Sequence, residues 1–292
     1  MKLVVFAHVP PPFHGQSFMV QQLLDELQED NSEVLDVFHI DARLSKDIDD
    51  IASVGFRKFF LLFSYCMRAI WLRVIKGATH FYYVPAPGLR SAVYRDWIVM
   101  LLCRPFYRNI IYHYQAAGVG AWLETKAYNW ERWVSQFLLG RASLSIVLGD
   151  YYHEDAGKLC PKKVITIPNC CPDPCPDYEE RIKPKQLARA DALNSEGTFS
   201  VLYLSLCYRE KGLFDLIEAI AVVNNRLRDD GLVKRVQLDV AGKFYLPKEE
   251  AEFNERINQA DLIDDHGSMV IYHGFADETK KLKLFSQADA FS

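Results

Sequence analysis

The sequence of 292 residues has no excess of charge of either sign. Its 34 lysines and arginines nearly balance its 38 aspartates and glutamates, so the formal net charge is -4. Nonspecific binding to nucleic acid depends on an excess of cations that neutralise phosphates, so this composition argues against a nucleic-acid partner. Locally basic surfaces remain compatible with it.

Long apolar runs are also missing. No stretch reaches the roughly 18 uncharged apolar residues that mark a membrane-spanning helix. The apolar segment Met1–Ala7 is too short for a signal peptide, and Pro10–Pro12 interrupts the chain soon after it. We therefore expect a cytoplasmic protein that begins with a β-strand.

The Cys-x-x-Cys motif of many metal sites is absent. The seven cysteines form no Cys-x-x-Cys motif and their number is odd, which fits a reducing compartment better than a disulfide framework. Cys170, Cys171 and Cys175 lie close together, but no fourth ligand accompanies them. We expect no metal there and interpret the segment as a rigid interdomain hinge.

The Gly-x-Gly-x-x-Gly fingerprint is missing after the first strand, yet the chain alternates strand-like and helical patterns as α/β proteins do. The length suggests about two domains. We predict a first domain over residues 1–178, a linker at 179–197 and a second domain over 198–292. Parallel strands are predicted at 3–7, 34–39, 80–84, 109–113, 144–148, 164–167, 199–204, 236–241, 269–272 and 288–292.

Two turns that lead into helices are candidates for anion binding. In the first, Gly15 permits close approach of a ligand and Ser17 can cap a helix whose N–H groups attract anions. A proline-stiffened turn without a ligand explains the same residues. In the second, Arg209 and Lys211 together with the helix terminus can hold a diphosphate. Solvated charges ahead of a helix are the alternative there.

His113 is a third candidate because it ends a predicted strand. Open α/β sheets bind ligands at the carboxyl ends of their strands. A histidine in this place can donate to a sugar hydroxyl or to a phosphate. A purely structural histidine is the alternative.

Two segments combine aromatic, aliphatic and basic side chains. The basic residues in 56–77 and 97–109 include Arg57, Lys58, Arg68, Arg73, Lys76, Arg104 and Arg108. Helices of this kind can lie on an anionic membrane with their basic side chains among the head groups. Sheet-covering helices with solvated basic edges show the same pattern. Peripheral contact with the inner face of a membrane therefore stays open.

Six short motifs follow one another along the chain. They are Pro-Pro-Pro-Phe-His-Gly-Gln-Ser, Tyr-His-Tyr-Gln, Ile-Pro-Asn-Cys, Tyr-Leu-Ser-Leu-Cys-Tyr-Arg-Glu-Lys-Gly, Leu-Asp-Val-Ala-Gly and Ile-Tyr-His-Gly-Phe. Together they resemble glycosyltransferase family 4, the group 1 glycosyltransferases, over essentially the whole chain. The resemblance implies the GT-B architecture, in which two Rossmann-like domains face a cleft, the first holding the acceptor and the second the nucleotide sugar. It also implies retention of anomeric configuration, without a cofactor or a metal.

The resemblance assigns roles to individual residues. The residues that it places around the donor and its phosphates are Gly15, Gln16, Lys211, Gly242, Gly274 and Phe275. His113 would contact the transferred sugar and is the catalytic candidate, while Asn169 would shape the hinge.

Two departures from the family pattern affect these assignments. Leu206 stands five residues before Lys211, where the family has arginine or asparagine, and Arg209 is the nearest substitute. The chain ends with Ala288–Ser292, which we predict to be a buried strand. In the family, paired glutamates that hold ribose and phosphate follow this strand. We therefore expect a C-terminally truncated second domain.

The sequence thus predicts a retaining glycosyltransferase that moves a sugar from a nucleotide-diphosphate sugar to a polysaccharide or lipid-linked acceptor. A nucleotide-sugar epimerase of the same fold is one alternative, although no convincing set of carboxylates for proton transfer is present. A non-catalytic fragment that binds sugar nucleotides is the other.

Overall fold

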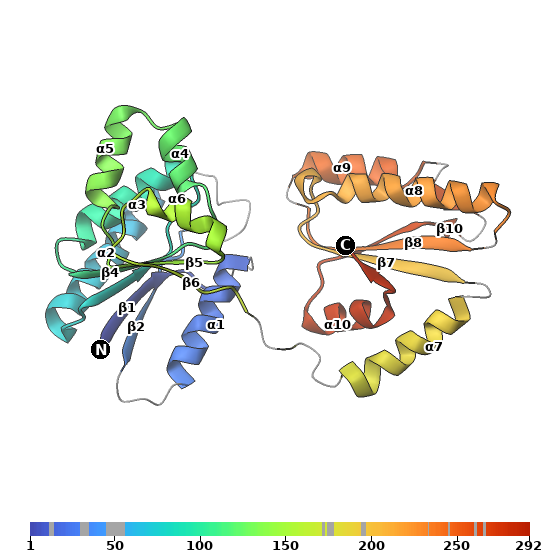
Figure 1. Ribbon diagram of the computed structural model, residues 1–292, viewed down its shortest axis with the longest axis horizontal. Coiled ribbons are helices and arrows are strands. Elements are labelled where there is room, and N and C mark those ends of the chain that lie inside the picture. Colours follow the sequence, from blue (N-terminus) through green and yellow to red (C-terminus); the bar gives the residue numbers. More distant parts are fainter. Residues whose placement is uncertain are drawn as a thin grey trace. The chain divides into compact units, whose positions relative to one another are not determined.

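Two compact units make up the chain, Met1–Cys171 and Pro172–Ser292. The computed structural model describes residues 1–11, 15–29, 35–44, 56–170, 173, 178–193, 197–232, 234–244, 246–259, 262–264 and 267–292. Each unit is built around one main parallel sheet flanked by helices (Figure 1). The predicted α/β class with two Rossmann-like parallel sheets is confirmed.

Six described strands form the sheet of the first unit, in the order β2-β1-β3-β4-β5-β6. They are β1 (Lys2–Ala7), β2 (Asp36–Asp41), β3 (His80–Tyr83), β4 (Asn109–His113), β5 (Leu144–Val147) and β6 (Val164–Thr166), and all pairs are parallel. Each lies within two residues of its predicted range. The prediction succeeds because a buried parallel strand is a short apolar run bounded by turn residues.

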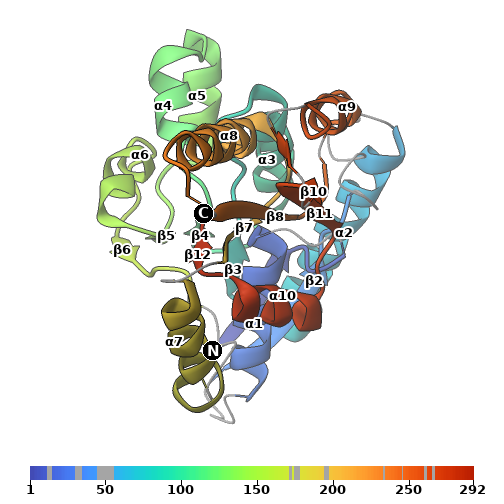
Figure 2. The same ribbon diagram turned by 90° about the vertical axis from the view of Figure 1, so that its right-hand side faces the viewer.

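The two faces of this sheet carry different helices (Figures 1 and 2). On one face α1 (Gly15–Glu29) packs its buried Val20 and Leu24 against β1 and β3. On the other face lie α2 (Phe56–Lys76), α3 (Arg90–Cys103), α4 (Val119–Thr125), α5 (Asn129–Leu138), the short turn η2 (Asp150–Tyr152) and α6 (His153–Gly157). The strand order explains this division. Strands β2 and β3 lie on opposite sides of β1, so the connection from β1 to β2 and the connection from β2 to β3 run across the sheet in opposite directions. Because both crossovers are right-handed, α1 and α2 lie on opposite faces.

A buried carboxylate fixes the loop between β3 and α3. Asp96 is 1% exposed and accepts hydrogen bonds from the Tyr83 hydroxyl at 2.6 Å and the Ala86 N–H at 2.7 Å. These bonds compensate a charge that would be costly to bury alone. A Cβ on Gly88 would lie 2.0 Å from the carbonyl oxygen of Gly118, so glycine allows this loop to pack on the one after β4. Both loops are thereby held at the carboxyl edge of the sheet.

The second unit has four described strands in its main sheet, in the order β11-β8-β7-β12. They are β7 (Thr198–Leu204), β8 (Arg235–Ala241), β11 (Val270–Gly274) and β12 (Ala290–Phe291), all parallel, and β9 (Ile263–Asp264) pairs with β10 (Gly267–Ser268) in a separate antiparallel ladder. The predicted last strand is present as β12, but the prediction that it is buried holds only for its start. Ala288 is 8% exposed, whereas Phe291 is 60% exposed.

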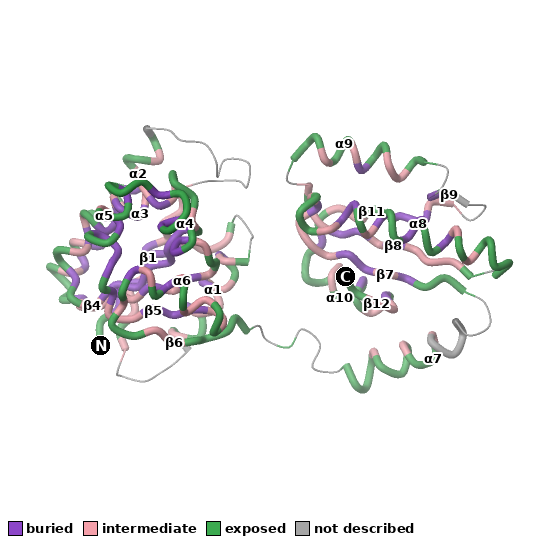
Figure 3. The backbone as a smooth tube through the Cα atoms, turned by 45° about the horizontal axis from the view of Figure 1, so that its top comes forward, coloured by how far each residue is buried: buried purple, intermediate pink, exposed green. Residues whose placement is uncertain are grey.

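Both faces of this second sheet are packed against helices (Figure 2). On one face α8 (Leu213–Asp229) and α9 (Pro247–Arg256) cover the strands, and Leu213 and Ile217 of α8 are fully buried. Each such side chain contributes about 1.5–3 kcal/mol to stability. On the other face α10 (Glu278–Gln287) packs Leu284 against Leu202. The strands β7 and β8 are mostly buried or half-buried, as Figure 3 shows.

The division between the units differs from the predicted boundaries. It falls between Cys171 and Pro172, and the predicted linker at 179–197 is largely helical, comprising η3 (Tyr178–Ile182) and α7 (Lys183–Leu193). An ion pair of 2.7 Å between Arg189 and Asp289 ties α7 to the second unit. The helix escapes prediction because it is mostly exposed and carries little apolar periodicity. Of the clustered cysteines, Cys171 and Cys175 lie outside the described residues.

Candidate functional site

The turn after β1 is anchored to the end of β2. The guanidinium of Arg43 donates to the carbonyl oxygens of Val9 at 3.3 Å and Pro10 at 3.2 Å. It also pairs with Asp41 at 2.8 Å, whose other oxygen accepts from the Val9 N–H at 3.4 Å. One ion pair thus fixes the backbone that leads from β1 toward Gly15.

Gly15 is the first residue of α1, at the carboxyl edge of the sheet. A Cβ built on it meets no heavy atom within 4 Å in the described part of the chain, so packing within the protein does not require glycine. Gln16 follows and is half-buried. The predicted capping role of Ser17 is wrong, because α1 begins two residues earlier and Ser17 is buried within its first turn. The open space at Gly15 is compatible with close approach of a ligand.

The strand order places this turn at a topological switch point. Strands β2 and β3 lie on either side of β1, and ligands of open α/β sheets bind outside the carboxyl ends of the strands at such a point. His113 ends β4, one strand beyond β3. Because Tyr82 pairs with Ile111, His113 projects from the same face as Tyr82, the face that carries α1.

A chain of side-chain hydrogen bonds runs through His113. The amide nitrogen of Asn169 donates to Oε1 of Gln115 at 3.1 Å, which turns the Gln115 amide nitrogen toward Nε2 of His113, also at 3.1 Å. Since this amide group is a donor, Nε2 accepts and the ring proton lies on Nδ1. Nδ1 then donates to the hydroxyl oxygen of Tyr82 at 2.6 Å. The contacts therefore select one tautomer of His113.

Burial determines the charge of His113. It lowers the pKa of the imidazole to about 4, because the charged form loses its hydration. The ring is therefore neutral at physiological pH. It can form directional hydrogen bonds to a hydroxyl group, but it supplies no positive charge to a phosphate.

Lys211 lies at the carboxyl edge of the second sheet. It ends the short turn η4 (Arg209–Lys211), and Gly212 then adopts a left-handed φ of 77° before α8 begins. Strand β7, which leads into this turn, has β8 and β12 on its two sides and so marks the switch point of this sheet. Lys211 is exposed, and among the described residues no carboxylate pairs with it. Its ammonium group is available to an anion at the start of a 17-residue helix.

Arg209 points elsewhere. Its guanidinium forms an ion pair with Glu252 of α9 and lies over the ring of Phe214, 4.6 Å from the centroid. Its backbone N–H donates to Glu249 at 3.2 Å. The structure therefore engages Arg209 with acidic residues of α9 and leaves Lys211 as the unpaired cation of this turn.

The other residues assigned to the nucleotide follow β8 and β11. Gly242 has a φ of 155°, and a Cβ there would lie 1.8 Å from the carbonyl oxygen of Ser205, so packing of the two loops explains this glycine. Its N–H donates to the carbonyl oxygen of Gly274 at 2.9 Å. Phe275 is 54% exposed, and the ammonium group of Lys243 lies 5.2 Å from its ring centroid. These residues form one cluster at the carboxyl edge.

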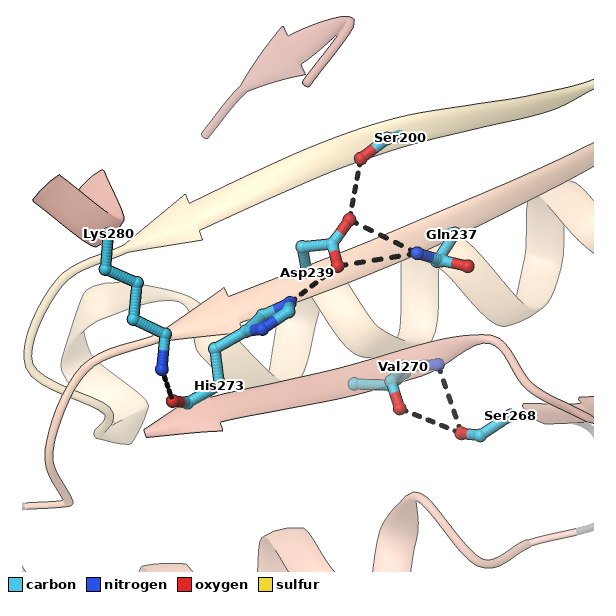
Figure 4. Close-up of polar contacts among 7 residues, drawn as sticks. All are labelled: Ser200, Gln237, Asp239, Ser268, Val270, His273 and Lys280. Atoms are coloured by element: carbon cyan, nitrogen blue, oxygen red, sulfur yellow. Dashed lines mark hydrogen bonds and ion pairs between the residues drawn. The ribbon is translucent and has the colours of Figure 1, made fainter. Parts of the chain in front are cut away.

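A polar network supports this cluster from within the sheet (Figure 4). One oxygen of Asp239 is 2.7 Å from Nε2 of His273, and the other accepts from the Ser200 hydroxyl at 2.6 Å. Gln237 donates to the same carboxylate at 3.3 Å. Lys280 of α10 donates to the carbonyl oxygen of His273, the residue directly before Gly274. The network therefore fixes the end of β11 and the start of its loop.

Sequence patterns miss several of these residues. Tyr82 and Gln115 become partners of His113 only through strand register and a loop contact. Asp239 leaves a weak signal, because Gln237 and Asp239 alternate with the buried Leu238 and Val240 and so indicate one polar face of β8.

No model of a known protein family matches the sequence, and no curated protein matches it either. Solved structures do match. A sucrose-phosphate synthase from Thermosynechococcus elongatus has a TM-score of 0.61 at 16% identity, covering 100% of this chain and 75% of that one. A trehalose-6-phosphate structure from E. coli bound with UDP-2-fluoro glucose has a TM-score of 0.55 at 12% identity, covering 100% and 77%.

A trehalose-6-phosphate synthase analysed with bisubstrate glycomimetics for glycosyl transfer with retention also matches. Its TM-score is 0.55 at 10% identity, covering 97% of this chain and 75% of that one. These neighbours are GT-B glycosyltransferases. This chain has the GT-B fold. At such low identity the likeness establishes the fold alone, so the predicted membership of family 4 stays a prediction.

Proposed function

We propose that this chain is a retaining glycosyltransferase of the family 4 type, which transfers a sugar from a nucleotide-diphosphate sugar to a polysaccharide or lipid-linked acceptor without a cofactor or a metal. The observation that carries the proposal is Lys211. It is an exposed cation, unpaired among the described residues, at the switch point of the second sheet in a chain with the GT-B fold.

The donor diphosphate is the group that this arrangement suits. Negative charge grows on the leaving diphosphate as the glycosidic bond breaks. The ammonium group of Lys211 and the N-terminal N–H groups of α8 are positive and lie at the same turn. A preorganised positive site of this kind stabilises the leaving group more than it stabilises the intact donor.

The nucleotide would lie against the cluster that follows β8 and β11. Phe275 offers an exposed aromatic ring, and Lys243 beside it offers a second cation. The left-handed φ of 67° at Gly274, together with the bond from Gly242, sets the direction of this loop. Both features support contact between the loop and the nucleotide.

His113 is the proposed contact for the transferred sugar. As a neutral ring it can exchange hydrogen bonds with a sugar hydroxyl, and it carries no positive charge that would attract a phosphate. The hydroxyl would take the place of the Gln115 amide at Nε2, which is the ring nitrogen farther from Tyr82.

The acceptor is proposed to be presented at the inner face of a membrane. In the described part of the chain, no helix is both long and apolar enough to cross a bilayer. The contact that we propose is peripheral.

Two measurements test the proposal. Calorimetry with UDP, GDP and ADP tests whether the chain binds a nucleoside diphosphate. The proposal is overturned if none of the three binds. Incubation with radiolabelled nucleotide sugars and a glycan or lipid extract then tests transfer. Product labelled on the acceptor supports a transferase. Isomerised donor without acceptor would instead indicate an epimerase, and binding without either product would indicate a non-catalytic protein.

A further inference from the structure

Helix α2 exposes an apolar stripe along its outer face. Its most exposed large apolar side chains are Phe59 at 51%, Phe60 at 67%, Phe63 at 43%, Met67 at 37%, Trp71 at 51%, Val74 at 65% and Ile75 at 61%. At about 100° per residue, Phe60, Met67 and Trp71 fall within roughly 40° of arc on the helix surface. The stripe therefore runs along the helix axis as one continuous surface.

The opposite face of α2 is already in use. Leu62, Cys66, Ala69 and Leu72 are all at most 6% exposed and belong to the main core of the first unit. The packing on the sheet thus accounts for one apolar face and leaves the other unexplained. A surface helix of a globular protein ordinarily presents polar residues there.

The charge of α2 has one sign. The helix carries five basic residues, Arg57, Lys58, Arg68, Arg73 and Lys76, and no acidic residue. The whole chain has a formal charge of -4, so the charge of this helix is opposite in sign to that of the chain. Arg57 and Arg68 fall within about 80° of Phe60 around the helix and so border the apolar stripe on one side.

The other segment considered for membrane contact, residues 97–109, has a different environment. Trp97 is 9% exposed and Met100 is fully buried. The Arg104 guanidinium donates to the carbonyl oxygen of Leu138 at 2.7 Å. Leu101 and Phe106 are 58% and 41% exposed, but helix α3 ends at Cys103, so they do not form a stripe along one helix as the side chains of α2 do.

We propose that the outer face of α2 docks on an anionic lipid bilayer, with Phe60, Met67 and Trp71 inserted at the level of the head groups. Aromatic and aliphatic side chains bordered by cations, with no acid, match the interfacial helices that bind such surfaces. A second copy of the chain is the less suitable occupant, because a symmetric dimer through α2 would place two basic helices against each other. The inference rests on the membrane contact of the proposed function and names the surface that makes it.

The test measures binding of the full chain to vesicles in the absence of any donor. Vesicles of phosphatidylcholine with an equal part of phosphatidylglycerol should sediment the protein, whereas pure phosphatidylcholine should bind it about tenfold less. A rise to ~0.5 M salt should weaken binding by a similar factor, because the attraction to the lipid charge is screened.

Three variants locate the surface. The double variant Phe60→Ser with Trp71→Ser should lower vesicle affinity about tenfold or more, because apolar contact area is lost. The double variant Arg57→Glu with Arg68→Glu keeps the apolar stripe and should lose the preference for anionic lipid. Trp133→Ser is the matched control. Trp133 on α5 is 69% exposed, and its replacement should leave binding unchanged.

Folding and self-association are checked on the same samples. Circular dichroism melting should be unchanged in each variant, since all substituted side chains are exposed on the surface. Equal vesicle binding by the wild type and the Phe60/Trp71 variant, or an equal loss in Trp133→Ser, would overturn the inference. The inference would also be overturned if the wild type were a dimer that dissociates in the α2 variants, and if vesicles bound neither the wild type nor these variants. Calorimetry with a nucleoside diphosphate reports on the donor site separately, so failure of either proposal is recognised without the other.

Discussion

The imidazole of His113 donates a hydrogen bond of 2.6 Å from Nδ1 to the phenol oxygen of Tyr82 on the neighbouring strand β3. The bond that Nε2 accepts from Gln115 requires a neutral ring, because both ring nitrogens of a protonated imidazole are donors. Burial favours the same state. The ring at the end of β4 is thus held in one tautomer by residues from a strand and a loop.

The stability of the protein should depend on pH through His113. Its pKa falls from the ordinary value of 6.5 to about 4 in the folded protein, so between these values the unfolded chain binds more protons. The stabilisation that comes from keeping this ring neutral is complete above pH ~6.5 and is lost as the pH falls toward ~4. It amounts to at most about 3.4 kcal/mol of unfolding free energy, at about 1.36 kcal/mol for each pKa unit. Urea unfolding of the wild type and of His113→Asn at a series of pH values measures it. A difference between the two that does not change with pH would contradict the assignment.

Nucleoside-diphosphate binding should depend on Lys211. Replacing it in Lys211→Ala removes the unpaired cation of the η4 turn and should weaken binding by about 1.5–3 kcal/mol, the range for a charge-assisted hydrogen bond. Calorimetry measures this change. Lys185→Ala on α7 is the matched control, because Lys185 is also an exposed lysine of the second unit. Equal affinity of Lys211→Ala and the wild type would remove Lys211 from the site.

Gly15 and Gly242 should respond in opposite ways to alanine. Gly15→Ala adds a methyl group where no described atom lies within 4 Å, so stability should stay level or rise by about 0.5 kcal/mol. Gly242→Ala places a Cβ 1.8 Å from the Ser205 carbonyl oxygen and should cost about 2–4 kcal/mol. Urea unfolding measures both. If donor phosphate approaches Gly15, the first variant should also lose transfer activity while remaining folded.

The Asp239 network should contribute to the stability of the second unit. Asp239→Asn replaces one acceptor oxygen with a donor N–H₂ group, so Ser200 or His273 can keep its contact only by changing from donor to acceptor. The expected cost is about 1–3 kcal/mol, because Asp239 is only 14% exposed at its side chain. Asp229→Asn, on the exposed end of α8, is the control and should change stability little. Identical unfolding curves for Asp239→Asn and the wild type would show that the network carries no net stability.

Transfer, once observed, should continue in the presence of a metal chelator. The proposed stabilisation of the diphosphate comes from Lys211 and the N-terminus of α8, so EDTA should leave the rate within about twofold. Assays with labelled donor, with and without EDTA, measure it. Loss of transfer that returns on addition of a divalent cation would contradict the proposal.

The sequence by itself determined the strands, the alternation with helices and the presence of two parallel-sheet units. Short apolar runs such as Val4–Ala7 and Phe81–Val84 are buried on both sides of a sheet, and burial of that kind leaves a local signal that needs no knowledge of the rest of the chain. The positions of His113 and Lys211 at carboxyl ends of strands followed from the same signal.

Only the tertiary structure decided which side chains meet. The bond between His113 and Tyr82 depends on the register of β4 against β3, and the ion pair between Arg209 and Glu252 joins residues from η4 and α9. Hydrogen bonds and ion pairs between distant residues depend on the path of the whole chain, so no local pattern encodes them. The ion pair between Arg189 of α7 and Asp289 is a further example, since it spans a hundred residues of sequence. The local sequence determines the chemistry that a side chain offers, but the fold determines which side chain it contacts.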